Sequence, residues 1–279
     1  MRTLACAVAL AACAAAAPAL AQDSLSDRWD ARLAAVTGEV VVHPAGGGDE
    51  ISGAVDMPLE DGDRVTTSAG ATAEIALDGG SLIALRESTD FTLEDTRKSA
   101  SIFSITLGSI LAKIQKLGSQ SLSVRSPTSV AAVRGTEFGV DVEGDQSHVG
   151  VFDEGRVEVK GQSGGTEVLT PNQETSVARG QAPLRAAPLR RFAARRALMR
   201  AHVQRAAFVR RNWKPMAAAQ RRQARVNALK RLHRRGSRQK RARQRQTPEN
   251  RERQREEQRR QLRRQPRRKA KKRAARSEP

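Results

Sequence analysis

Cysteine is almost absent from this chain of 279 residues. The two cysteines, Cys6 and Cys13, both lie within the first 21 residues. Once that segment is removed no thiol remains, which excludes disulfides, thiolate catalysis and cysteine metal sites. Tyrosine is absent, and Phe and Trp are few. Beyond residue 22 no apolar run reaches the roughly 18 residues of a spanning helix, so we expect no membrane span there.

Motifs of catalysis and metal binding are also missing. The sequence contains no phosphate-binding loop and no H-E-x-x-H. His43 and His148 are isolated, and a lone histidine is usually a surface or hydrogen-bonded residue. We therefore expect no enzyme activity, no cofactor and no metal.

The N-terminus has the features of a secretory leader. It carries Arg2, then an apolar run over Leu4–Ala17, and ends in Ala-Leu-Ala at Ala21. This is the small-x-small pattern of a signal peptide, with cleavage after Ala21. The alternative is lipoprotein processing at Cys13, which is less favoured because the residues after it stay apolar. We predict a periplasmic or secreted protein.

The charge is divided between two parts of the chain. Residues 22–184 carry 13 Lys and Arg against 25 Asp and Glu, a net charge of −12. Residues 185–279 carry 36 Lys and Arg against 5 Asp and Glu, a net charge of +31. An acidic body followed by a strongly basic extension suggests that the extension binds polyanions.

The acidic body has the pattern of an all-β domain. Between Val36 and Arg179 short runs of β-forming residues alternate with Gly/Asp turns. Thr72–Leu77, for example, places Ala73, Ile75 and Leu77 on one face. Strands of this length with turns every 8–12 residues predict a β-solenoid-like or sandwich-like fold. Two segments, Gly70–Leu93 and Gly135–Val159, look alike, which favours stacked β-coils.

The most specified stretch is Val124–Val142. Pro127 favours an extended Ser126, and Gly135 separates two runs of strand period. This stretch resembles the hallmark of the FecR-type domain, in which a segment like Val-Arg-Gly-Thr-x-Phe precedes a strand pair similar to Gly155-Arg-Val-Glu-Val. The motif residues are Pro127, Arg134, Gly135, Thr136, Glu137, Phe138 and Gly155.

The resemblance implies a periplasmic all-β module. FecR-like proteins are typically membrane-spanning regulators of sigma factors that receive a signal in the periplasm. This chain has a cleavable leader where those proteins have their cytoplasmic segment, so direct sigma-factor control does not carry over. The resemblance implies a module that binds an envelope protein or another envelope component.

Two groups of polar residues are candidate sites, each with a structural alternative. Arg134, Thr136 and Glu137 are candidates for ligand binding, but we favour a role in holding the bend around Gly135. Three further carboxylates around one turn are candidate Ca²⁺ ligands, although their spacing fails the EF-hand pattern and a solvated turn is favoured. They are Asp141, Glu143 and Asp145.

We predict five regions. They are a signal peptide over 1–21, a linker over 22–35, the FecR-like domain over 36–182, basic amphipathic helices over 183–235 and an Arg/Gln-rich disordered tail over 236–279. The first helix is expected over Leu189–Trp213, with an apolar face containing Phe192 and Met199. A second follows Pro215, with Ala219 and Val226 on its apolar face.

The predicted function is a non-enzymatic interaction module whose basic extension tethers it to anionic envelope surfaces. Phospholipid headgroups and lipopolysaccharide are the expected surfaces. A nucleic-acid-binding protein is one alternative, disfavoured because an exported protein rarely meets nucleic acid. A signal-sensing component related to sigma-factor regulation is the other. The extension also has the charge to dock on its own acidic body, a contact that salt would weaken.

Overall fold

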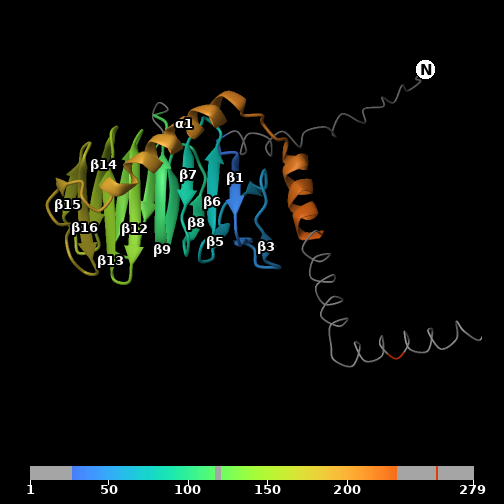
Figure 1. Ribbon diagram of the computed structural model, residues 1–279, viewed down its shortest axis with the longest axis horizontal. Helices are drawn as coiled ribbons and strands as arrows, with labels where there is room; N and C mark the ends of the chain where they lie inside the picture. The colour runs from blue at the N-terminus through green and yellow to red at the C-terminus, as the bar shows by residue number, and fades with distance from the viewer. Residues whose placement is uncertain (1–26, 117–120, 231–255, 257–279) are drawn as a thin grey trace, which may run out of the picture. The chain divides into compact units, whose positions relative to one another are not determined.

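The computed structural model describes residues 27–116, 121–230 and 256 (Figure 1). The predicted signal peptide and the predicted tail, Glu256 excepted, lie outside the described residues. The chain divides into two units, residues 1–225 and residues 226–279. The fold and the site below belong to the first unit.

The body consists of two sheets that share strand β9. The first sheet has the order β4 (Pro58–Leu59), β1 (Ala31–Thr37), β6 (Thr72–Leu77), β7 (Leu82–Leu85), β9 (Ser101–Lys113), β12 (Glu137–Glu143), β13 (Gln146–Val151), β16 (Gln173–Ala178) and β17 (Ala187–Pro188). The second has the order β3 (Ile51–Ser52), β2 (Val40–His43), β5 (Arg64–Thr67), β8 (Asp90–Asp95), β9, β10 (Leu122–Arg125), β11 (Ser129–Arg134), β14 (Arg156–Gly161) and β15 (Thr166–Leu169).

The chain winds from one sheet to the other as it advances. Most neighbouring strands are antiparallel, whereas β9 and β10 are parallel. Because the chain advances along both sheets as it winds, strands close in sequence are close along each sheet. Figure 1 shows this in the colour gradient from β1 to β16. The all-β prediction is confirmed, and the structure combines both of its forms: two packed sheets, built by a chain that coils between them.

Alternation of apolar and polar residues creates the core between the sheets. In β14, Val157 and Val159 are fully buried while Glu158 between them is exposed. Phe91 of β8 and Phe103 of β9 pack edge-to-face, with ring centroids 5.8 Å apart. Burial of such side chains, each contributing about 1.5–3 kcal/mol, is the main stabilising term of this domain.

Buried threonines mark the places where the chain passes between the sheets. Thr136 lies between β11 and β12, and its Oγ1 is 3.1 Å from the carbonyl oxygens of both Arg134 and Arg156. Gly155 crosses directly over it, since a Cβ on Gly155 would lie 2.5 Å from Thr136 Cα. Thr89 is likewise buried between β7 and β8, opposite Gly108 of β9. These crossings are the repeated element of the fold.

A helix covers the outer face of the first sheet. The turn η2 (Ala193–Arg195) leads into α1 (Arg196–Asn212), which lies across the strands in Figure 1. Phe192 and Met199 pack with Leu111 of β9 and with Phe152. Gly139 makes room for this contact, because a Cβ there would lie 2.7 Å from the Phe192 ring.

The structure corrects the predicted domain boundaries. Residues from Asp27 onward are not linker, because β1 pairs with β6 and the buried Trp29 donates its Nε1–H to Ser101 Oγ at 2.7 Å. The body does not end at residue 182, because β17 continues the first sheet. The first strand of the body begins at Ala31, before Val36, and it ends at a turn where Gly38 has a φ of +74°.

The helices also differ from their predicted forms. The first begins at Arg196, and the buried positions of Phe192 and Met199 are confirmed. The second helical segment covers residues 218–230, and Ala219 and Val226, two members of its predicted apolar face, are exposed. Arg221 is buried in their place. Apolar spacing failed there because carboxylates of the body, distant in sequence, accept the guanidinium.

Candidate functional site

The motif residues of the Val124–Val142 stretch hold the crossing between the sheets. Thr136 and Phe138 are fully buried, whereas Arg134 is exposed at the end of β11. Gly135 has a φ of +57°, which favours glycine, and a Cβ there would approach Lys116 at 2.5 Å. Pro127 lies in the turn before β11, where its carbonyl oxygen accepts a hydrogen bond from Gln162. The structure thus brings Gly135, Thr136 and Gly155 together and directs Arg134 away.

Glu137 belongs to a buried charged group. Its Oε1 lies 3.2 Å from Nζ of Lys113, and both side chains are about nine-tenths buried. Lys113 also pairs with Glu154, which is mostly exposed. One buried cation with two carboxylates is a satisfied ion-pair group. Such a group fixes the end of β9 against β12.

Two of the three candidate calcium ligands, Asp141 and Glu143, are instead partners of arginines from the extension, whereas Asp145 pairs with Arg179 of the body. Asp141 on β12 has a side chain only 2% exposed and accepts hydrogen bonds from Ser109 at 2.6 Å and from Nε of Arg191 at 3.0 Å. Arg195 pairs with the same carboxylate, and Arg191 also binds Glu143. No group of metal ligands occurs among the described residues.

These contacts determine the ionisation of Asp141. Burial by itself raises the pKa of a carboxyl group. The hydrogen bonds from Arg195 and Ser109 and the positive charge of Arg195 outweigh burial, so the pKa of Asp141 lies below its ordinary value. The carboxylate is therefore charged at neutral pH and anchors the start of the extension.

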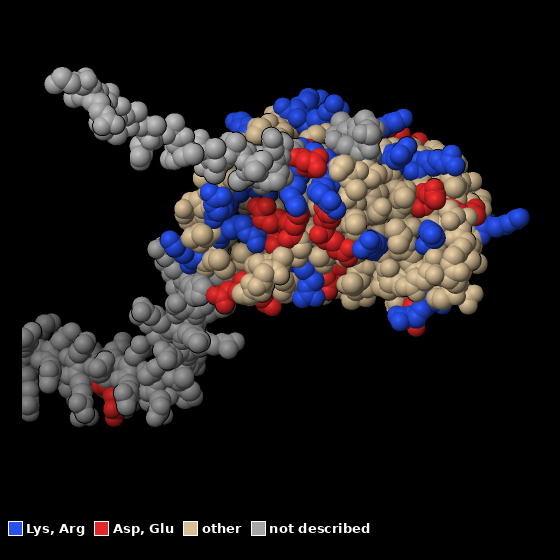
Figure 2. Space-filling model, turned by 180° about the vertical axis from the view of Figure 1, so that it is seen from behind, with Lys and Arg blue, Asp and Glu red and all other residues tan. Residues whose placement is uncertain are grey.

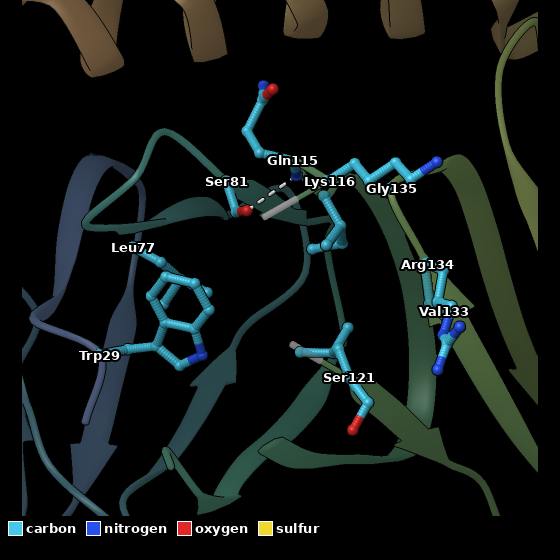
Figure 3. A pocket seen from close by; sticks show the side chains of 11 residues that line it. Trp29, Leu77, Ser81, Gln115, Lys116, Ser121, Val133, Arg134 and Gly135 are labelled. Atoms are coloured by element: carbon cyan, nitrogen blue, oxygen red, sulfur yellow. Dashed lines mark hydrogen bonds between the residues drawn. The ribbon is translucent and has the colours of Figure 1, made fainter. Parts of the chain in front are cut away.

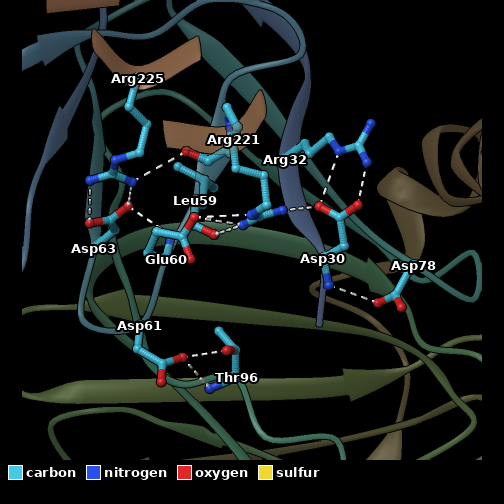
Figure 4. Close-up of polar contacts among 11 residues, drawn as sticks. Asp30, Arg32, Leu59, Glu60, Asp61, Asp63, Asp78, Thr96, Arg221 and Arg225 are labelled. Carbon is cyan, nitrogen blue, oxygen red and sulfur yellow. Dashed lines mark hydrogen bonds and ion pairs between the residues drawn. The ribbon is translucent and has the colours of Figure 1, made fainter. Parts of the chain in front are cut away.

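A second set of arginines binds the other end of the body (Figure 4). Arg221, from the helical segment after Pro215, pairs with Asp30 and with Glu60, and donates to the carbonyl oxygen of Leu59 at 2.8 Å. Arg225, one turn further along, pairs with Asp63, whose side chain is 1% exposed. A buried guanidinium requires acceptors for most of its five donors, and these carboxylates and carbonyls supply them.

A cleft of about 440 Å³ lies beside this second set, lined by acidic and basic side chains. Its carboxylates are already bonded within the protein. Asp61 accepts from the Thr96 N–H at 2.9 Å, and Asp78 pairs with Lys98 and accepts from the Asp30 N–H (Figure 4). The cleft therefore offers no free charge of one sign to a ligand.

A smaller pocket of about 60 Å³ lies beside the crossing at Gly135 (Figure 3). Trp29 and Leu77 line one side, and Ser81 accepts the Gln115 N–H at 3.0 Å on another. This volume holds only a few water molecules. Arg134 lies across the pocket from Trp29 in Figure 3 and is exposed. This pocket beside the motif is therefore too small for a typical ligand.

The surface in Figure 2 shows the combined result, with acidic side chains gathered in the middle of one face and basic side chains around them. Several arginines of the extension reach carboxylates of the body. The pairs are Arg191 with Asp141 and Glu143, Arg195 with Asp141, Arg196 with Asp153, Arg205 with Glu74, Arg221 with Asp30 and Glu60, and Arg225 with Asp63. The sequence left open whether the extension docks on its own acidic body, and the structure shows this contact for residues 191–225.

Comparison with known families bears on the body. Residues 63–158 match the family described as FecR protein. The chain carries a FecR domain. The match includes the crossing at Thr136 and Gly155, which confirms the predicted resemblance. It leaves out β1 and all of the extension.

Solved structures similar to this chain are few and distant. Two crystal structures of proteins assigned as anti-sigma factors from Parabacteroides distasonis match it. One has 18% identity and a TM-score of 0.42 over 48% of this chain and 64% of the other. The second has 19% identity and a TM-score of 0.40 over 45% of this chain and 59% of the other. This chain spans less than two thirds of either. No curated protein matches it.

Three residues beside the FecR domain were missed by sequence reasoning. Arg221 and Arg225 looked like part of a uniformly basic run, and His202 looked like one polar residue of α1. His202 is buried, with Nε2 2.8 Å from the Leu82 carbonyl oxygen. Its position one turn from Met199 and from Ala206, on the apolar face, was the available signal.

None of the described helices is apolar over the length needed to cross a bilayer.

Proposed function

We propose that this chain is an exported, non-enzymatic interaction protein. Its FecR domain binds an envelope protein or another envelope component, and its basic extension holds the domain on anionic envelope surfaces. The match of residues 63–158 to the FecR family carries the proposal, and it supports a signal-sensing role. The leader ending at Ala21 supports export.

The docked helices refine how the extension would act as a tether. Residues 185–230 contain 14 Lys and Arg and no acidic residue. Six of these arginines pair with the body and are used in folding. Residues 231–279 add 22 Lys and Arg against 5 acidic residues, so most of the charge available to a polyanion lies after Lys230.

Export is tested by the intact mass of the protein purified from its native source. Loss of residues 1–21 is the expected result. A retained N-terminus would remove the export argument and favour the nucleic-acid alternative. A mass that corresponds to a chain beginning at Cys13 with attached lipid would show that the protein is a lipoprotein.

Tethering is tested with the mature full-length chain at low salt, mixed with anionic phospholipid vesicles or with lipopolysaccharide. We expect co-sedimentation that weakens as salt rises, because the contact is electrostatic. A chain that stays in solution with both surfaces would overturn the tether. Double-stranded DNA serves as the competing polyanion, and tighter binding to DNA at equal salt would favour the nucleic-acid alternative.

Partner binding is tested by cross-linking the full chain in envelope extract. The recovered protein is then purified, and its affinity for the full chain is measured. We expect a saturable complex with one purified envelope protein by calorimetry. The absence of any saturable complex would contradict the interaction role. Hydrolytic activity that disappears on substitution of one carboxylate would instead indicate an enzyme.

A further inference from the structure

The solvent-exposed side of α1 carries two large apolar side chains. Phe208 is 61% exposed and Leu198 is 49% exposed. The other five phenylalanines of the chain are all fully buried. A single exposed apolar residue needs no explanation, but Leu198 and Phe208 belong to one arginine-rich helix, and basic helices that expose apolar side chains are suited to contact with a surface.

The same face is basic and free of acidic residues. Arg200 and Arg211 flank Phe208 on the side of α1 opposite Met199 and Ala206. Neither arginine has an ion pair with any described residue, in contrast to Arg205, which pairs with Glu74. Other exposed cations of residues 185–225 likewise lack such a pair: Arg185, Arg190, Arg210, Lys214 and Arg222.

The ion pairs beneath α1 remove the charge that would repel an anionic surface. Without the extension this side of the body would present the carboxylates of Glu74, Asp141 and Asp153. Each is paired with an arginine of the extension, and Asp141 is buried. Docking of α1 thus replaces an acidic face by a basic one. With 17 residues, α1 offers a contact about 25 Å long.

We propose that this outer face of α1, defined by Leu198, Arg200, Phe208 and Arg211, binds the surface of a bilayer that contains anionic phospholipid. The arginines bind phosphate groups, and Leu198 and Phe208 enter the boundary between headgroups and acyl chains. Bilayer lipid fits this face better than a soluble polyanion does, because a soluble polyanion offers no apolar layer to the two side chains. This inference rests on the proposed tether and assigns part of it to α1.

The test uses the full mature chain with vesicles of phosphatidylethanolamine containing about 30% phosphatidylglycerol. The variant carries Leu198→Ser and Phe208→Ser. The matched control carries Val55→Ser and Leu184→Ser, two equally exposed apolar residues outside α1. All four side chains are exposed, so both variants keep the fold, which circular dichroism checks. We expect the α1 variant to bind about tenfold more weakly and the control to bind like the wild type.

Each outcome decides between the two proposals. If the wild type and the α1 variant bind vesicles equally, the role of α1 is overturned while the tether stands, carried by residues after Lys230. If the wild type binds neither vesicles nor lipopolysaccharide, both fail. If lipopolysaccharide or inorganic phosphate binds and the bilayer does not, the choice of phospholipid is wrong. Retained binding by Arg200→Gln with Arg211→Gln would also contradict the proposal.

Discussion

Asp141→Asn tests whether the extension is fastened to the body by the buried carboxylate. The substitution keeps the size of the side chain and removes its charge. Arg191 and Arg195 then lose their common partner, although Arg191 still reaches Glu143. Residues 191–195 lead directly into α1, so the weakened contact lies at the start of the docked helix.

The expected loss of stability follows from burial. Removing one partner of a buried ion pair costs about 3–5 kcal/mol. Here the arginine side chains are 33% and 25% exposed, so water compensates them in part, and asparagine still accepts one hydrogen bond. We therefore expect the free energy of unfolding to fall by about 2–3 kcal/mol at pH 7.

The penalty should depend on pH. The folded-state pKa of Asp141 is below its ordinary value, so its charge contributes stability above about pH 4. That contribution is lost as the pH falls from about 4 through the folded-state pKa, because in that range the unfolded chain binds a proton that the folded protein does not. The difference between wild type and Asp141→Asn should therefore shrink in acid.

Urea unfolding, followed by circular dichroism at several pH values, measures both effects. Asp145→Asn is the control, since Asp145 lies in the next turn and pairs with Arg179 while both side chains are more than half exposed. Its expected cost is below about 0.5 kcal/mol. Equal costs for the two variants, or a penalty for Asp141→Asn that does not change with pH, would refute the reasoning.

Three further predictions concern other parts of the domain. Gly155→Ala should destabilise by more than about 2 kcal/mol, because the new Cβ would meet Thr136 at a φ of +101°. Gly144→Ala, at a φ of +56° and in open space, should cost about 1 kcal/mol, and thermal unfolding compares the two. Phe192→Ala should cost about 3–5 kcal/mol and Phe208→Ala less than about 0.5 kcal/mol by urea unfolding, because the first ring is buried and the second is exposed. Glu137→Ala should lower the free energy of unfolding by about 1–3 kcal/mol, since it leaves buried Lys113 with only Glu154. Arg134→Ala should leave the free energy of unfolding unchanged, because Arg134 is exposed. A larger loss for Arg134→Ala than for Glu137→Ala would show that the motif arginine supports the fold.

The strands of the body were largely predictable because each leaves a local signal. Alternation of period two located β6 over Thr72–Leu77 with the observed bounds, and glycines marked the turns. The pattern failed at β1, because Gly38 interrupts an apolar run that continues on both sides of the turn. It also failed to show that Asp27–Ala35 belongs to the body, since Trp29 is buried by contact with Ser101, a residue distant in sequence.

The candidate site was predictable only as a division of charge. The excess of carboxylates before residue 185 and of arginines after it is visible in composition. Composition does not show that Asp141 receives two arginines while Asp145 remains at the surface. That difference depends on which side chains of β12 face η2 and α1, and the placement of the helix decides it.

The sequence by itself determined the strand pattern, the FecR-type segment and the opposite charges of body and extension, because each is a property of neighbouring residues. The tertiary structure alone decided what the charges do. It buries Arg221 against Asp30 and Glu60, residues far apart along the chain, and leaves Phe208 exposed. A buried guanidinium is stable only where folding brings its acceptors together, and no local pattern records that meeting.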